Sequence, residues 1–185
     1  VLGADLAQPM LQGIGLLVRH PDKWLETQYR QMHALLAPDS YYSWLSQPAQ
    51  QATLARSPGL GLEAVGHGGA IPEYFEGAAV LGKAPVIGGA LQGSFERLGG
   101  AFSAAGNVGR ILWEQSSYNA YAKANRSAEL VDFINHATGY ISTAGMGISQ
   151  TQRGAESMLF LAPRYLRATM AVAGDFLNGG AAPEA

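Results

Sequence analysis

The chain contains no cysteine, and only 14% of its 185 residues are charged, whereas about 25% is usual. The lack of cysteine excludes disulfide frameworks, zinc sites built on thiolates and thiol nucleophiles. The 12 Lys and Arg residues and 14 Asp and Glu residues give a net charge of −2, which argues against a protein that binds nucleic acid by neutralising its phosphates. We therefore expect no sequence-specific nucleic-acid partner.

Long apolar runs are also missing. The longest charge-free stretch, residues 133–152, is interrupted by Asn, His, Ser, Thr and Gln side chains. A membrane-spanning helix needs about 20 mainly apolar residues, so we expect no transmembrane segment. The residues that follow Val1 do not form a signal peptide, and a start at Val1 favours a fragment or processed piece of a longer chain.

Glycine is abundant by contrast, with 24 residues. Glycine and proline gather in residues 57–89, where they would cost a regular helix too much, so we expect a long irregular excursion there. Four other glycines lie inside a helical pattern, at Gly99, Gly100, Gly106 and Gly109. Because a small residue lets another backbone approach closely, we expect these four to be packing glycines that meet a neighbouring chain or segment.

Apolar residues recur at spacings of three and four along most of the remaining chain, which is typical of helices. The expected helices are residues 9–19, 21–36, a short one from 40 that Pro48 ends, a long central helix over about 91–121, 127–138 closed by Gly139, and a last one that Pro163 restarts after residues 158–161 and that continues until Gly179. No strand pattern is found. The sequence thus predicts an all-α fold, with one irregular multi-helix domain over residues 1–178 and a linker or tail over 179–185.

The helix expected after Pro21 carries its apolar side chains on one face. They are Trp24, Leu25, Met32, Leu35 and Leu36, with Gln28 among them. An aromatic set in the same region could form an interaction surface, although core packing is the favoured interpretation: Trp24, Tyr29, Tyr41, Tyr42 and Trp44.

Three short blocks follow one another along the chain. The first runs from Asp5 through Gly13 to Arg19-His20-Pro21 and Trp24, the second is Phe133-Ile134-Asn135-His136-Ala137-Thr138-Gly139, and the third is Phe160-Leu161-Ala162-Pro163-Arg164. Together they resemble a helical module of the very large polyvalent proteins of tailed bacteriophages. Their order and rough spacing agree with that module over most of residues 5–170.

The resemblance implies a non-enzymatic structural or internal virion protein, present in the phage particle and, during infection, in the host cell envelope. It would act through contacts with other virion proteins and copies of itself, in the particle or the genome-ejection apparatus. It implies no catalytic residue, and the sequence offers no cofactor-binding or metal-binding set. The signature residues are read as structural: Asn135 and Thr138 as helix-end polar groups, Gly139 as a left-handed turn, and Arg164 as holding the corner after Pro163.

Two alternatives remain open. The first is a small hydrolase that uses Glu73 and Glu76 as an acid and base pair, because these carboxylates are three residues apart in the irregular excursion. The second is a membrane-active ejection peptide in transient contact with lipid, built on the long glycine-bearing helix.

Overall fold

The computed structural model describes residues 13–63, 65, 88–140 and 170 of the chain. This part is 79% helical and contains six helices and no strand, so the all-α prediction is confirmed. In chain order the helices are α2 (Ile14–Arg19), α3 (Pro21–Leu36), α4 (Asp39–Leu45), α5 (Pro48–Arg56), α7 (Gly88–Lys123) and α8 (Ser127–Ala137). Met170 also lies in a helical turn.

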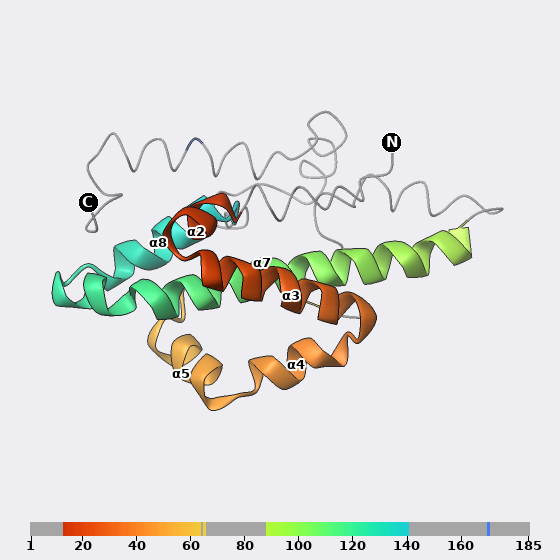
Figure 1. Ribbon diagram of the computed structural model, residues 1–185, viewed down its shortest axis with the longest axis horizontal. Helices are drawn as coiled ribbons and strands as arrows, with labels where there is room; N and C mark the ends of the chain where they lie inside the picture. The colour runs from red at the N-terminus through yellow and green to blue at the C-terminus, as the bar shows by residue number, and fades with distance from the viewer. Residues whose placement is uncertain (1–12, 64, 66–87, 141–169, 171–185) are drawn as a thin grey trace.

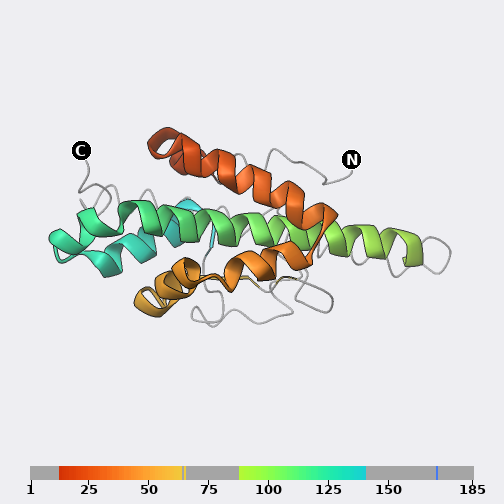
Figure 2. The same ribbon diagram turned by 60° about the horizontal axis from the view of Figure 1, so that its bottom comes forward.

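The long helix α7 organises the described residues. It has 36 residues and is therefore roughly 54 Å long. Helix α3 crosses it on one side, while α4 and α5 lie on the other (Figure 2). Helix α8 turns back beside the C-terminal half of α7, after a short loop in which Asn125 has a φ of 56° (Figure 1). Most of α7 is consequently surrounded by other helices.

Two apolar clusters pack around α7. One joins α2, α7, α8 and the non-helical residue Leu60, through Leu16, Leu60, Trp113, Tyr121, Leu130, Val131, Phe133 and Ile134. The other joins α3, α4 and α7 through Ala34, Tyr41, Trp44, Ala104, Val108, Ile111 and Leu112. Of the aromatic set noted above, Tyr41 and Trp44 are therefore core residues, whereas Tyr29 and Tyr42 are exposed.

Prolines begin helices in two places. Pro21 starts α3 as expected, and Pro48 starts α5, a helix that the sequence interpretation missed because it used Pro48 only as a stop. Proline fits the first turn of a helix, since the N–H that it lacks would have no partner inside the helix. Two smaller differences concern caps: α4 begins at Asp39 without a side-chain cap, and Ser127 is the first helical residue of α8, not its cap.

The glycine-rich regions divide into two kinds. Residues 57–63 and 65 are non-helical, in keeping with the expected excursion, but Gly88 and Gly89 already belong to α7. Position 64 and residues 66–87 lie outside the described residues, as do the last expected helix apart from Met170 and the tail.

Within the described residues, the atoms nearest to Gly106 and Gly109 belong to side chains, so packing of these glycines against another backbone stays a prediction. A Cβ atom at Gly106 would lie 3.5 Å from the Arg110 guanidinium, and one at Gly109 would lie 3.7 Å from Thr27, which are ordinary contacts with side chains. Gly99 is buried and Gly100 half-buried. A tight position lies in α2, where a Cβ at Gly15 would come within 2.6 Å of the Trp113 ring.

Candidate functional site

A ladder of polar side chains runs along the inward face of α7. Its members are Ser103, Asn107, Arg110, Glu114 and Ser117, each at most 2% exposed. Their spacing of four, three, four and three keeps them on one side of the helix. Because a buried polar or charged group is costly without partners, this ladder requires matching groups on the segments that cover it.

The main partner of the ladder is the non-helical segment of residues 57–63, which we call the strap. Asn107 in α7 binds one strap residue twice: its Oδ1 accepts from Glu63 N at 2.8 Å and its Nδ2 donates to Glu63 O at 2.7 Å. Asn135 in α8 bridges two more, accepting from Gly61 N at 2.9 Å and donating to Gly59 O at 3.0 Å. Two side-chain amides thus bind the main chain of three strap residues.

Arg110 occupies the centre of the ladder. Its guanidinium donates to Gly61 O at 2.7 Å and to Thr138 Oγ1 at 2.8 Å, and one nitrogen lies 3.9 Å from a carboxylate oxygen of Glu63. The ring of Tyr140 stacks over the same guanidinium, with 5.0 Å from the ring centroid to Cζ. The buried positive charge of Arg110 thus has partners in α8, in the strap and in the ring of Tyr140.

Glu114 anchors the beginning of the strap. Its fully buried carboxylate accepts two hydrogen bonds from Arg56, at 2.8 and 2.6 Å, and one from the Ser57 hydroxyl at 2.7 Å. The hydrogen bond with Glu114 raises the pKa of Arg56 above its usual range. The C-terminal end of α5 is thereby fixed against α7 at the residue where the strap begins.

Small residues in the strap make this approach sterically possible. A Cβ atom at Gly61 would overlap the ring of Tyr140, and one at Gly59 would lie 3.2 Å from Val131 Cγ1. Between them, the side chain of Leu60 is buried in the apolar cluster of α7 and α8. The main-chain groups of the strap therefore meet the polar side chains of α7 and α8. The apolar side chain of Leu60 enters the core between the helices.

The signature residues of α8 lie in this site. The helix ends in a Schellman motif: Tyr140 N donates to Asn135 O, Gly139 N donates to His136 O, and Gly139 has a φ of 74°. Thr138 Oγ1 donates to Ile134 O while it accepts from Arg110. The motif places Tyr140 over Arg110 and Gly61. Pro163 and Arg164 lie outside the described residues.

Sequence interpretation did not identify Asn107, Arg110, Glu114 or the strap. A signal was present, because polar residues repeat along α7 with the periodicity of one helix face. Such a face is ordinarily assigned to solvent, and nothing in the local sequence indicates that residues 40 to 58 positions away will cover it. The contacts with the strap needed the tertiary structure.

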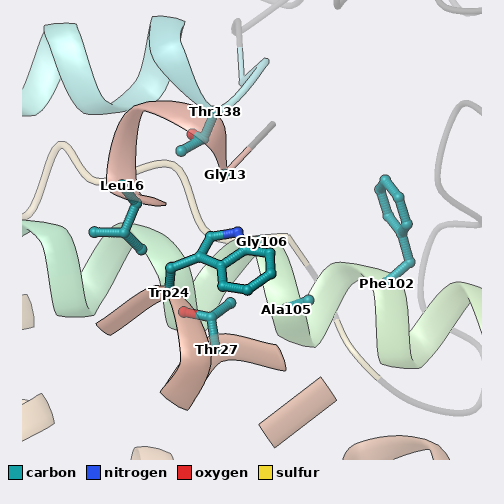
Figure 3. Close-up of a pocket in the computed structure, with 9 residues that line it drawn as sticks. Gly13, Leu16, Trp24, Thr27, Phe102, Ala105, Gly106 and Thr138 are labelled. Carbon is teal, nitrogen blue, oxygen red and sulfur yellow. The ribbon is translucent and has the colours of Figure 1, made fainter. Parts of the chain in front are cut away.

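Two hollows lie beside α3. The first is lined by Leu16, Trp24, Thr27, Phe102, Ala105 and their neighbours, and its volume of about 20 Å³ leaves room for roughly one water molecule (Figure 3). The buried indole N–H of Trp24 at this hollow has no hydrogen-bond partner among the described residues. The second hollow, of about 110 Å³, lies between α3 and α4 and is lined by Tyr29, Arg30, His33, Ser40, Tyr41, Trp44 and Val108. Both are small compared with pockets that enclose a metabolite.

The outward face of α3 is apolar. Leu25, Tyr29, Met32 and Leu36 follow one another at spacings of four, three and four, and they are 62%, 61%, 51% and 80% exposed. The residues that α3 buries are Thr27, Gln31 and Ala34. The apolar face noted in the sequence is thus largely a surface feature, which we call the α3 stripe.

Other candidate chemistry is not brought together by the described residues. They contain no group of three or more His, Cys, Asp and Glu side chains arranged to hold a metal ion. Glu73 and Glu76, the acid pair of the hydrolase alternative, lie outside them. Among the described helices, none combines the length and apolar character that crossing a membrane requires.

Comparisons of the chain with protein-family models, with curated proteins and with solved structures find no match.

Proposed function

We propose that the chain is a non-enzymatic helical module of a tailed-phage particle, acting through protein contacts as a structural or internal component, or as part of the genome-ejection apparatus. Its partners would be other proteins of the particle and copies of itself. The proposal rests on the resemblance of the three sequence blocks and on one structural observation, the α3 stripe.

The α3 stripe supports a contact function because it is continuous and exposed. Apolar side chains that follow one another along a helix face favour a partner, since their burial removes apolar surface from water. Beside the stripe, Arg30 is held by Glu26 at 2.8 Å and lies over the Trp44 ring, 4.9 Å from its centroid. The border of the stripe is therefore already ordered, which lowers the entropy cost of docking a partner.

The test begins with purified particles of the phage that encodes the chain. Quantitative mass spectrometry should find this segment in the particles at a fixed ratio to the capsid protein, and its absence from them would contradict the proposal. A double variant, Met32→Lys with Leu36→Lys, should remain folded but be incorporated less. Ala55→Lys, on the exposed surface of α5, is the matched control and should be incorporated normally.

A further inference from the structure

The strap is held like a bound peptide. The main-chain groups that meet helix side chains belong to alternate residues, Gly59, Gly61 and Glu63. The strap begins with a turn, in which Leu60 N donates to Ser57 O at 3.1 Å, and residues 61–63 follow without a turn or helix. When a peptide binds in a groove, main-chain hydrogen bonds supply affinity and side-chain contacts supply specificity. In this chain the receptor is the groove formed by the ladder of α7 together with Asn135, Thr138 and Tyr140 of α8 and its end.

The groove also selects a sequence. It places the Ser57 hydroxyl on Glu114, excludes any side chain at position 61 by the Tyr140 ring, and binds the Glu63 carboxylate through Ser103 Oγ at 3.0 Å. Leu60 enters the apolar core. The matching ligand is thus Ser-Pro-Gly-Leu-Gly-Leu-Glu, and every copy of the chain carries it.

We propose that residues 13–63 of one copy dock on α7 and α8 of a second copy, with the strap of each chain in the groove of the other. Because this partner is a copy of the chain, the proposal builds on the protein-contact function above. The segment from α2 to the strap is joined to α7 only through residues 64–87. The described contacts between the two halves can therefore form between two copies as well as within one, as in domain swapping.

The length of that connection permits the exchange. Glu63 is bound to Asn107, which lies roughly 29 Å along the helix from the start of α7 at Gly88. Residues 64–87 can span up to roughly 80 Å when fully extended. Since the same connection also lets the strap reach its own groove, a single chain closes on itself when dilute. Exchange between copies becomes favoured when copies are concentrated, as they would be inside a particle.

The test uses two full-length variants with defects in opposite halves. Gly61→Ala places a methyl against Tyr140 and damages the strap, while Asn135→Ala removes both main-chain bonds from the groove. In an exchanged mixed dimer, one unit combines the intact strap of one chain with the intact groove of the other, and the remaining unit carries both defects. One unit per dimer should then regain wild-type stability.

One variant is isotopically labelled, and the two are unfolded and refolded separately and together at high concentration. We expect native mass spectrometry to find mixed dimers only in the joint sample, together with an unfolding transition at the wild-type temperature that neither variant shows alone. A joint sample that equals the sum of the separate ones would overturn the proposal.

The test still decides the proposal if one variant does not fold alone. In that case folded protein should appear only when the two variants are refolded together. Glu63→Ala, which removes the Ser103 and Arg110 contacts, is a second strap variant for the same mixture. Gly109→Ala and Asn119→Ala repeat the two chemical changes where no strap contact is involved, and both should melt as single, stable species. Particle composition is measured independently, so the failure of this proposal and the failure of the proposed function are distinguishable.

Discussion

Helices α7 and α3 differ in the kind of residue that they bury and expose. The face that α7 turns inward is polar over Ser103, Asn107, Arg110, Glu114 and Ser117, whereas the face that α3 turns outward is apolar over the α3 stripe. In α7 this polar face is buried in addition to the apolar residues of the two clusters, whereas in α3 much of the apolar face is exposed. The difference shows that periodicity identifies a helix face, while the neighbouring segments decide whether that face is core or surface.

The two faces have different physical reasons. The polar face of α7 is tolerated because the strap and α8 satisfy it with hydrogen bonds, above all around Arg110. The inward face of α3 is built from Thr27, Gln31 and Ala34, and the Thr27 side chain lies against α7 at Gly109 at an ordinary contact distance. Thr27 satisfies its own hydroxyl by donating to Lys23 O at 2.9 Å.

The largest effect is expected from Arg110→Ala. It leaves Thr138 Oγ1 and Gly61 O without their donor and removes the cation beside Glu63, so we expect a loss of about 3–5 kcal/mol in the free energy of unfolding. Urea denaturation followed by circular dichroism would measure it. Arg97→Ala, in the same helix but exposed, should change stability by less than about 0.5 kcal/mol. Equal effects of the two variants would show that the ladder does not stabilise the fold.

A smaller loss is expected from Asn107→Ala. The change removes both bonds to Glu63 and the bond from Asn107 Nδ2 to Tyr41 Oη at 2.9 Å, leaving buried groups unpaired at a cost of about 1–3 kcal/mol. The same denaturation experiment measures it. Asn119→Ala, on the exposed surface of α7, is the matched control, and a polar face that mattered only through helix propensity would give the two variants equal stability.

These first two predictions also mark what the sequence could and could not supply. The helical class, the long central helix and the end of α8 at Gly139 follow from local signals, because periodicity and turn residues act over a few positions. The site does not, since Asn135 binds Gly59 and Gly61 more than 70 residues away. Pro48 was misread for a related reason: proline ends one helix and begins the next with the same fixed φ.

A gain in stability is expected from Gly109→Ala. The new methyl would meet Thr27 at 3.7 Å, an ordinary contact, and alanine is better than glycine inside a helix by about 0.8–1 kcal/mol. Gly15→Ala should act in the opposite direction, because its methyl would lie 2.6 Å from the Trp113 ring. Thermal unfolding of both variants tests whether close packing by glycine occurs at α2 or in α7, and destabilisation by Gly109→Ala would favour α7.

The smallest effect on the isolated chain is expected from Leu36→Lys. Leu36 is 80% exposed, so the free energy of unfolding should change by less than about 0.5 kcal/mol. Ala34→Lys, two residues earlier but buried in the cluster around Tyr41 and Val108, should destabilise the chain strongly. If Leu36→Lys also unfolds the chain in calorimetry, the α3 stripe is core and not a contact surface.

Hydrogen exchange at two strap amides tests most directly whether the polar face of α7 holds the strap. Gly61 N–H is bound by Asn135 and Glu63 N–H by Asn107, so both amides should exchange as slowly as those in the middle of α7, although neither lies in a helix or strand. In the Asn135→Ala variant, protection should fall at Gly61 more than at Glu63. Exchange of both amides in the wild-type chain at the rate of an unstructured peptide would contradict the bound strap.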